Sequence, residues 1–335
     1  MAKIAFFELE PWEKDYIKEH LKGHELIFVD DHLDDLNVSK AADCEAIAIF
    51  IYSQMTKAIL GRLPKLKLIT TMSTGFDHID LEVCKECNIT VCNVPTYGEN
   101  TVAEHTMALL LAISRKIIPS VERTRRSSYD LTNLRGFDLK GKTIGVVGTG
   151  KIGKHVIKYA KAFDMKVLAY DKFPDEAFAK EMDYEYVELD KLLSESDVIS
   201  LHLPFLKETE HIINKKNIRK IKKGCVLINT ARGGLVETEA LLMGIKEKIL
   251  KSCGLDVLEE EAAIREEKEL LHETFKRAVD LKTMLEGHIL LDLDNVYITP
   301  HNAFNSTEAL QRILDTTINN INSFLSGVPQ NTVGK

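Results

Sequence analysis

The stretch GVVGTGKIG, residues 145–153, carries glycines between a β-branched apolar run and the helix-forming segment KHVIKYAKAF, residues 154–163. In a strand–turn–helix unit, Gly148 permits a tight turn, Gly150 lets a phosphate group approach the backbone, and Gly153 lets the helix pack closely on the strand. The order of elements therefore predicts a parallel α/β domain that binds the pyrophosphate of a dinucleotide at the N-terminus of a helix.

A carboxylate follows this unit at the spacing expected for ribose recognition. The next predicted strand, KVLAYD, ends in Asp171, 18 residues after Gly153. A carboxylate there can accept hydrogen bonds from both ribose hydroxyls of the adenosine, and it repels a 2′-phosphate. We therefore expect NAD rather than NADP.

A second phosphate-binding pattern overlaps the first. Residues 136–143, GFDLKGKT, fit the P-loop pattern G-x-x-x-x-G-K-[ST], which would indicate nucleoside triphosphate hydrolysis. A P-loop needs a strand before its first glycine and a helix that begins at Gly-Lys-Thr. Here Thr143 enters a predicted strand and Gly136 follows polar loop residues, so we interpret this match as accidental.

Composition and charge argue against several classes of partner. The 335 residues carry a formal net charge of −7, with a pI of about 5.9, which argues against nucleic acid or an anionic membrane. The apolar run at residues 107–113 is far too short to span a bilayer. The N-terminal residues lack the pattern of a signal peptide, so we expect a cytoplasmic protein.

The cysteines do not follow the spacing of a metal site. Cys84 and Cys87 form one Cys-x-x-Cys pair, and no second pair completes four ligands. Both lie in a predicted helix, where free cysteine often packs as a small hydrophobic residue. We expect no metal.

Short apolar runs alternate with helix-forming segments along the chain, which is typical of parallel α/β architecture. Five strands are expected in the first hundred residues, and six more between residues 143 and 301. We predict two doubly wound parallel-sheet domains, of which the second has the size of a complete Rossmann domain for NAD. Residues 101–118 are predicted to form one buried helix, 259–288 a solvated helical excursion, and 307–325 a final amphipathic helix that Gly327 caps.

Polar residues follow three of the later predicted strands, at the edge where doubly wound folds bind ligands. They are Arg232, the glutamates at 259–261, and His301. An arginine can hold a substrate carboxylate through paired hydrogen bonds, and a histidine exchanges protons near neutral pH. An acidic partner would orient the histidine and favour its protonated form. Taken singly, the arginine could be a surface ion pair and the histidine a packing residue.

The chain resembles the D-isomer-specific 2-hydroxyacid dehydrogenases, in the subgroup that contains NAD-dependent D-lactate dehydrogenases, over nearly its full length. The resemblance is carried, in order, by TMSTGFDHID (71–80), NVPTYGENTVAEHT (93–106), GVVGTGKIGKHV (145–156), ESDVISLHLP (195–204), INTARGGLVET (228–238), GLDVLEEE (254–261) and ITPHNAF (298–304). It implies a discontinuous, flavodoxin-like substrate domain, residues 1–100 and 302–335, interrupted by a Rossmann NAD-binding domain, residues 101–301.

The resemblance also implies roles for individual residues. Arg232 would bind the substrate carboxylate, His301 would be the acid–base group at the C2 oxygen, and Glu261, rather than Glu259 or Glu260, would be the acidic partner of His301. The residues implied to contact the cofactor are Gly148, Thr149, Gly150, Lys151, Ile152, Gly153, Asp171, His202, Leu203, Pro204, Thr209, Thr230, Ala231, Arg232, Asp256 and His301. Those implied to contact the substrate are Tyr52, Ser73, Thr74, Gly75, Tyr97, Arg232, His301 and Phe304.

The substrate is less closely defined than the cofactor. Tyr52, Tyr97 and Phe304 match aromatic residues around the substrate methyl group of D-lactate dehydrogenases, which favours pyruvate, although the rings could simply pack the walls of the cleft. Asn302 is polar, and Asn305 stands where lactate enzymes often carry another aromatic residue. A wider or more polar pocket would suit larger 2-ketoacids or hydroxypyruvate. Reduction of hydroxypyruvate or glyoxylate therefore stays an alternative.

The resemblance further implies a partner and leaves a second class of function open. The helix that contains residues 104–115 usually packs at a homodimer interface in this family, which would explain its apolarity on all sides. We therefore expect a homodimer. Some relatives of this fold act as NAD-sensing corepressors that bind protein partners, and Arg232, Glu261 and His301 do not distinguish that function from catalysis.

Overall fold

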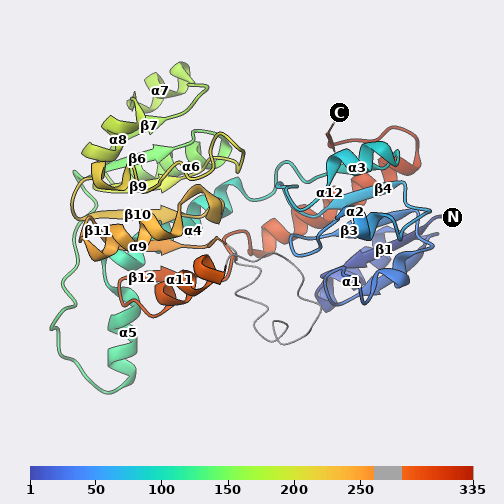
Figure 1. The fold of residues 1–335 in the computed structure, drawn as a ribbon, viewed down its shortest axis with the longest axis horizontal. Helices are drawn as coiled ribbons and strands as arrows, with labels where there is room; N and C mark the ends of the chain where they lie inside the picture. The colour runs from blue at the N-terminus through green and yellow to red at the C-terminus, as the bar shows by residue number, and fades with distance from the viewer. Residues whose placement is uncertain (260–280, 335) are drawn as a thin grey trace. The chain divides into compact units, whose positions relative to one another are not determined.

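The computed structural model describes residues 1–259 and 281–334 of the chain. Contacts between residues divide the chain into two compact units. The discontinuous unit consists of Met1–Gly98 and Asn305–Lys335, and the central unit of Glu99–Phe304. Each unit is built around one sheet with helices on its faces (Figure 1).

The discontinuous unit contains a six-stranded sheet in the order β13-β5-β4-β3-β1-β2. Neighbouring strands are parallel, except that β13 runs antiparallel to β5. The strands are β1 (Lys3–Phe7), β2 (Glu25–Val29), β3 (Ala46–Ile49), β4 (Leu68–Thr71), β5 (Thr90–Cys92) and β13 (Thr332–Val333). The order of the parallel strands is that of flavodoxin-like folds, as predicted. The two-residue strand β13 was not predicted.

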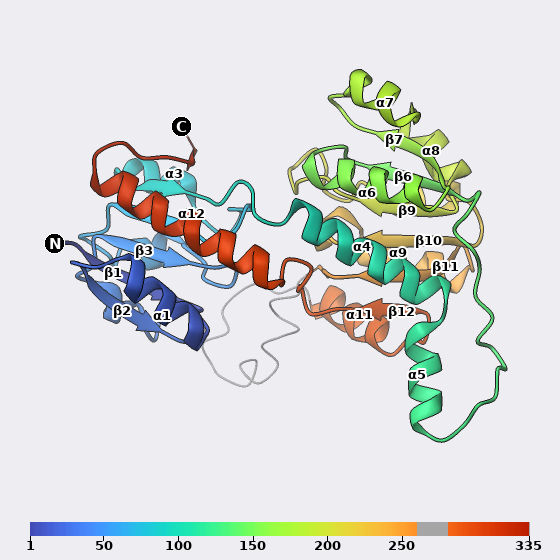
Figure 2. The same cartoon turned by 180° about the vertical axis from the view of Figure 1, so that it is seen from behind.

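The helices of this unit cover both faces of its sheet. They are α1 (Pro11–His20), α2 (Lys57–Leu60), α3 (Leu81–Glu86) and α12 (Thr307–Leu325), with a 3-10 turn at Val38–Ala41. Figure 2 shows α12 running along the sheet beside α1, and its contacts are with β4 and α1. Its bounds are those predicted, because Ser306 caps the first turn by accepting from the Ala309 amide, and Gly327 turns the chain away with a φ of +86°.

The central unit contains a seven-stranded parallel sheet in the order β12-β11-β10-β9-β6-β7-β8. Its strands are β6 (Thr143–Val147), β7 (Lys166–Tyr170), β8 (Glu185–Tyr186), β9 (Val198–Leu201), β10 (Cys225–Asn229), β11 (Leu250–Leu255) and β12 (Val296–Ile298). The order reverses direction at β6, which pairs with both β7 and β9. In doubly wound folds ligands bind at the carboxyl ends of the strands around such a reversal. The short strand β8 was not predicted.

Helices cover both faces of this sheet as well. They are α4 (Glu99–Ser114), α5 (Ile117–Arg125), α6 (Lys151–Ala162), α7 (Glu176–Met182), α8 (Leu189–Glu195), α9 (Thr238–Lys246) and α11 (Leu281–Leu291), with 3-10 turns at Ile218–Lys220 and Gly233–Leu235. One core lies under α4 and α6, and includes Leu110, Ile144 and Ile157. The other core lies under α8 and α9, and includes Leu192, Leu227 and Leu241. Figures 1 and 2 show these helices on opposite faces.

The predicted helix at residues 101–118 is two helices. Lys116 adopts a left-handed conformation, with a φ of +53°, and α5 begins directly after it. The Phe137 amide donates to the Ser114 carbonyl at 2.9 Å, so a distant residue satisfies the last turn of α4. The second helix, α5, continues to Arg125.

The segment at residues 136–143 does not have the structure of a P-loop. Thr143 begins β6, so the segment at 136–143 leads into a strand and not into the helix that a P-loop needs. Of the predicted excursion at 259–288, residues 260–280 lie outside the described part of the chain, and α11 accounts for most of the rest.

The described residues hold neither a membrane-spanning helix nor a metal cluster. Within residues 1–259 and 281–334, none of the helices is long and apolar enough to cross a bilayer. The same residues contain no group of three or more His, Cys, Asp or Glu side chains placed to hold a metal ion. Burial raises the pKa of the Cys84 thiol to about 11, so this cysteine stays protonated.

Candidate active site

The glycine turn after β6 has the shape of a phosphate site. Gly148 has a φ of +97°, and a Cβ on it would lie 2.7 Å from the backbone of His202. A Cβ on Gly153 would lie 2.1 Å from the Gly148 carbonyl oxygen, so α6 packs directly on the turn. By contrast, a Cβ on Gly150 would meet none of the described atoms within 4 Å. Gly150 is the N-cap of α6, and having no side chain it leaves the first amides of the helix open to an anion.

Asp171 lies beside this turn. It follows β7, and its Oδ2 accepts from the Thr149 amide at 2.6 Å, while its Oδ1 accepts from the Phe173 amide at 2.9 Å. Tyr186, a residue that the sequence did not single out, shares a hydrogen bond of 2.8 Å with the Thr149 hydroxyl. Of the other predicted turn residues, Lys151 forms an ion pair with Glu99 at 3.5 Å. Ile152 is partly buried against the core under α4 and α6.

Strand β9 leads into three predicted cofactor residues. His202 is partly exposed as a residue, but desolvation of its ring lowers the pKa to about 3, so the imidazole is neutral. Its Nε2 shares a 2.8 Å hydrogen bond with the Ser200 hydroxyl. Leu203 packs at the edge of the core. The Thr209 hydroxyl donates to the Pro204 carbonyl at 2.6 Å, so Thr209 closes the loop that carries Pro204.

Strand β10 leads into Arg232. Asn229 Nδ2 donates to the Arg232 carbonyl at 2.9 Å, and Asn229 Oδ1 accepts from the Ala231 backbone amide at 3.1 Å, which fixes the turn. The Thr230 hydroxyl shares a 2.8 Å hydrogen bond with that of Thr106 on α4. The half-buried guanidinium of Arg232 donates to the Ala231 carbonyl at 2.8 Å. A donor with several N–H groups therefore stands at the carboxyl edge of the sheet.

Strands β11 and β12 together hold His301. Asp256 is only 1 % exposed, and its carboxylate accepts from the Asn302 amide at 3.0 Å and from the Ala303 amide at 2.9 Å. The Thr299 hydroxyl donates to it at 2.5 Å, and His105 Nε2 lies 3.5 Å away. His301 itself has a φ of +52°, a conformation that costs free energy in residues other than glycine and is often found at functional sites.

Topology brings Arg232 and His301, two of the three predicted polar positions, to one edge and places Asp256 between them. Strands β10, β11 and β12 are parallel neighbours, so their carboxyl ends meet there. Arg232 follows the first, Asp256 the second and His301 the third. The glycine turn follows β6 and His202 follows β9, at the same edge of the same sheet. The central unit thus presents a guanidinium and an imidazole beside a dinucleotide site.

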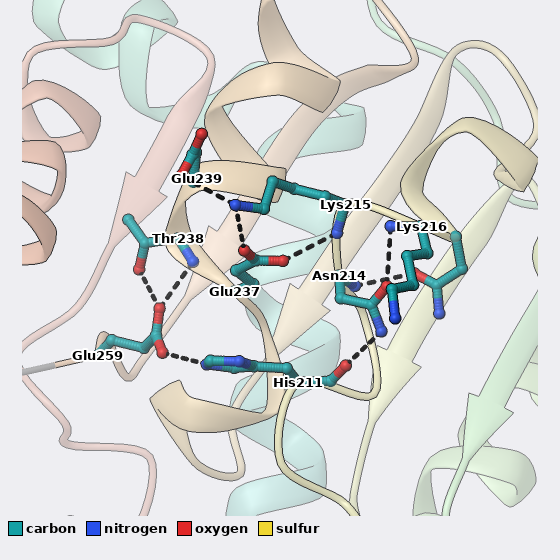
Figure 3. A network of polar contacts seen from close by, with 9 residues as sticks. His211, Asn214, Lys215, Lys216, Glu237, Thr238, Glu239 and Glu259 are labelled. Atoms are coloured by element: carbon teal, nitrogen blue, oxygen red, sulfur yellow. Dashed lines mark hydrogen bonds and ion pairs between the residues drawn. The ribbon is translucent and has the colours of Figure 1, made fainter.

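Glu259, the first of the glutamates after β11, bonds to two residues of the central unit. Figure 3 shows the Glu259 carboxylate between His211 and the first turn of α9. It accepts from His211 Nε2 at 2.5 Å, from the Thr238 amide at 2.7 Å and from the Thr238 hydroxyl at 2.6 Å. The Glu259 carboxylate is therefore engaged by His211 and Thr238, and Glu261 stays the predicted partner of His301. Glu260 and Glu261 lie outside the described residues.

The predicted substrate residues of the discontinuous unit lie in loops after β3, β4 and β5. Tyr52 follows β3 and Tyr97 follows β5, both half-buried. In the loop after β4, the buried Ser73 hydroxyl donates to the Gly75 carbonyl at 2.7 Å. The Thr74 hydroxyl donates to the Val94 carbonyl at 2.8 Å. Side-chain bonds thus fix the loop whose backbone amides were predicted to hold a carboxylate.

Several residues that hold these loops were missed from the sequence. They are Asn229, which fixes the Arg232 turn, Ser200, which bonds His202, Thr299, which bonds Asp256, and Tyr186, which bonds Thr149. Each lies close to the end of a strand. A side chain that holds a backbone turn, however, does not occur at a characteristic spacing in the sequence by which it could be recognised. Phe304 closes the central unit, three residues after His301, and is half-buried.

Comparison with known proteins agrees with this geometry. The sequence model of the family "D-isomer specific 2-hydroxyacid dehydrogenase, NAD binding domain" matches residues 107–303. The chain is 35% identical over 329 residues to the D-lactate dehydrogenase of Escherichia coli (strain K12), covering 97% of both proteins. It is 36% identical over 295 residues to the glycerate dehydrogenase of Methylorubrum extorquens, covering 86% of this chain and 85% of that one.

A solved structure shares the fold over the whole chain. The crystal structure of the D-lactate dehydrogenase from Aquifex aeolicus, complexed with NAD and lactic acid, superimposes with a TM-score of 0.88 at 37% identity, covering 99% of each chain. Full-length similarity at this identity, together with a glycine turn that fits a pyrophosphate, leaves one conclusion. The chain belongs to the D-isomer-specific 2-hydroxyacid dehydrogenases and is an NAD-dependent D-2-hydroxyacid dehydrogenase.

Proposed function

We propose that the enzyme interconverts a short 2-ketoacid and the corresponding D-2-hydroxyacid, with pyruvate and D-lactate as the preferred pair. The observation that carries this is the placement of Arg232, Asp256 and His301 after three neighbouring parallel strands, at the edge that also bears the NAD site. The relatives from E. coli and A. aeolicus, both D-lactate dehydrogenases, support the same substrate pair.

In the proposed mechanism each residue acts on a defined part of the substrate. Arg232 binds the carboxylate through its guanidinium, with help from the backbone amides of Thr74 and Gly75. His301 gives a proton to the C2 oxygen during reduction and takes it back during oxidation. Glu261 favours the protonated form of His301. Bound NADH supplies the hydride.

The binding of the cofactor rests on residues of the central unit. The amides at the N-terminus of α6 would hold the pyrophosphate, and Asp171 would accept from the ribose hydroxyls. His202, Pro204, Thr230 and Ala231 are proposed to line the nicotinamide side. The neutral state of His202 suits a position beside a ring that becomes cationic on oxidation, because a second positive charge would repel it.

Substrate size is proposed to depend on aromatic residues. Tyr52, Tyr97 and Phe304 would contact the side chain of the ketoacid. The methyl group of pyruvate is the smallest side chain that they would have to accommodate. The polar side chains of Asn302 and Asn305 favour hydroxypyruvate as a second candidate substrate, and the glycerate dehydrogenase of M. extorquens supports it.

The experiment is a panel of initial rates of NADH oxidation. The substrates are pyruvate, phenylpyruvate, 2-ketoisocaproate, hydroxypyruvate and glyoxylate. We expect the highest kcat/KM with pyruvate, and a product that a D-specific but not an L-specific lactate dehydrogenase oxidises. A highest value with hydroxypyruvate or glyoxylate would replace pyruvate by the second candidate. A lack of turnover with all five would contradict the proposal.

We also propose that the enzyme is a homodimer, with α5 in the interface. The apolarity of α4 needs no partner, because Met107, Leu110 and Ile113 are buried within the central unit. By contrast, Ile117 and Ile118 of α5 are 50% and 44% exposed. Figure 1 shows α5 extending away from the sheet.

Sedimentation velocity of Val121→Glu tests the interface, since Val121 is 45% exposed on α5. We expect the unmodified protein to sediment as a dimer and the variant as a monomer; a monomeric unmodified protein would contradict the proposal. The cytoplasmic location stays a prediction from the sequence.

A further inference from the structure

A carboxylate at the end of β1 binds the loop that carries Tyr52. Glu8 directly follows β1 and adopts a left-handed conformation with a φ of +63°. Its Oε1 accepts from the Phe50 amide at 3.3 Å and from the Ser53 amide at 3.0 Å. Its Oε2 accepts from the Tyr52 amide at 3.2 Å, and the Ser53 hydroxyl donates to Oε1 as well.

Holding a loop through a desolvated carboxylate costs free energy. Desolvation raises the pKa of Glu8, while the hydrogen bonds from Ser53, Tyr52 and Phe50 and the nearby His32 favour its charged form. A carboxylate can be kept in such an environment only if donors replace the lost water. Four donors from one short loop do so here, although the loop lies more than 40 residues away in the sequence. Glu8 and the loop therefore stabilise each other's conformation.

The bonds fix the part of the loop that determines where the Tyr52 ring lies. Donors on both sides of the Tyr52 Cα, its own amide and the amide of Ser53, end on the same carboxylate. The Ser53 hydroxyl also accepts from the Leu33 amide at 2.8 Å, which ties in the segment after β2. The Phe50 ring lies edge-on to the Tyr52 ring, with 6.4 Å between centroids. Hydrogen bonds to Glu8 thus hold the backbone of Tyr52, and the Phe50 ring packs against the Tyr52 ring.

We propose that Glu8 is a positioning residue for substrate selection: through its hydrogen bonds to the Tyr52 loop, it sets how much room the enzyme leaves for the side chain of the 2-ketoacid. The inference rests on the proposed function, in which Tyr52 contacts that side chain. Glu8 does not touch the substrate in this proposal, and its effect passes through the backbone of residues 50–53.

The variant Glu8→Gln tests the proposal because it preserves size and removes acceptors. One oxygen becomes an NH2 group, which cannot accept from the amides of Tyr52 or Ser53. Glu13→Gln is the matched control. Glu13 is also a buried carboxylate, on α1 of the same unit, and accepts from the Glu10 amide at 2.6 Å, away from the Tyr52 loop.

The measured quantity is the ratio of kcat/KM for pyruvate to kcat/KM for 2-ketoisocaproate. We expect Glu8→Gln to lower the ratio by about 10-fold, the scale on which an apolar pocket discriminates by size, mostly through the KM for pyruvate. Glu13→Gln should lower the melting temperature and leave the ratio unchanged. In a Tyr52→Leu background, Glu8→Gln should have no further effect on the ratio, because both changes act on one contact.

The outcomes separate this inference from the proposed function. If the unmodified enzyme reduces pyruvate and Glu8→Gln lowers only the melting temperature, Glu8 is a structural anchor and the inference is wrong. The same conclusion follows if Glu8→Gln changes the ratio by the same factor in the unmodified enzyme and in the Tyr52→Leu variant. If the unmodified protein reduces neither ketoacid, the proposed function fails, and the inference fails with it. Hydrogen exchange at the Tyr52 amide should speed up in Glu8→Gln and not in Glu13→Gln; equal protection in both would also overturn the inference.

Discussion

The carboxylate of Asp256, at the end of β11, accepts a hydrogen bond of 3.0 Å from the backbone amide of Asn302, the residue after His301. A second bond, from the Ala303 amide at 2.9 Å, ends on the other oxygen. Two bonds to a charged acceptor hold the turn in which His301 takes its left-handed conformation. Asp256 therefore fixes the backbone turn that carries the imidazole.

The first prediction follows from this relationship. Asp256→Asn replaces one acceptor oxygen by an NH2 group that faces a backbone N–H, so one bond to the turn is lost. We expect kcat to fall by about 10-fold or more, as positioning of an acid–base group is worth roughly that much. Asp197→Asn is the control, because Asp197 accepts from the Thr143 amide at 3.0 Å at the opposite edge of the same sheet. Equal effects of the two variants on kcat would contradict the role of Asp256.

Removal of the imidazole itself should be more severe. His301→Ala is expected to lower kcat by at least about 100-fold, the usual scale for loss of a positioned acid–base group. Binding of NADH, measured by fluorescence titration, should change much less, since the proposed pyrophosphate and ribose sites follow β6 and β7. Near-normal turnover in this variant would exclude His301 as the proton donor.

The parts of the site that the sequence reveals are those that depend on neighbours in the chain. The glycine turn and Asp171 lie within one strand–helix–strand unit, so spacing alone predicts them. The bonds of Asp256 to Asn302 and Ala303 join residues 46 and 47 positions apart, and they exist only once β11 and β12 are neighbours. Glu8 is a stronger case, because nothing in the local sequence marks it as the acceptor for a loop after β3.

The same division holds for the fold. The end of α12 is predictable because Gly327 follows it, and the strand alternation reveals both sheets. The end of α4 is not predictable, because neither Gly nor Pro directly follows Ser114 and Pro119 lies five residues further on. Its last carbonyl is instead satisfied by Phe137, whose approach depends on the whole loop between them. A strand of two residues, such as β13, is too short to show the residue pattern from which strands are predicted.

Asp171 should determine the choice between NADH and NADPH. The unmodified enzyme is expected to prefer NADH, since a carboxylate beside the ribose repels a 2′-phosphate. Asp171→Ala should lower the ratio of kcat/KM for NADH to kcat/KM for NADPH by about 10-fold or more. That factor corresponds to the free energy of roughly one charged hydrogen bond. Asp183→Ala, which removes a fully exposed carboxylate paired with Lys161, should leave the ratio unchanged. Equal use of NADPH by the unmodified enzyme would contradict this assignment.

His202 is expected to stay neutral throughout the working range of the enzyme. Burial lowers its pKa from 6.5 to about 3, so the folded state binds fewer protons than the unfolded state between these values. Its contribution to stability is therefore complete above about pH 6.5 and declines as the pH falls toward 3. In an NMR titration of selectively labelled histidine rings, the His202 resonance is identified as the one that is missing in His202→Gln. This resonance should show no protonation between pH 5 and 8. A midpoint near 6.5 would show that the ring is not desolvated.

The glutamates after β11 can be told apart by one pair of variants. Glu261→Gln should move the alkaline limit of ketoacid reduction to lower pH, because a neutral partner no longer favours protonated His301. Glu259→Gln should leave that limit unchanged and lower the melting temperature, since its carboxylate accepts from Thr238 at the start of α9 and from His211. The measurement is the pH dependence of kcat for pyruvate reduction in the two variants. If Glu259→Gln shifted the alkaline limit and Glu261→Gln did not, the partner of His301 would be Glu259, and its bonds to α9 would have to break during catalysis.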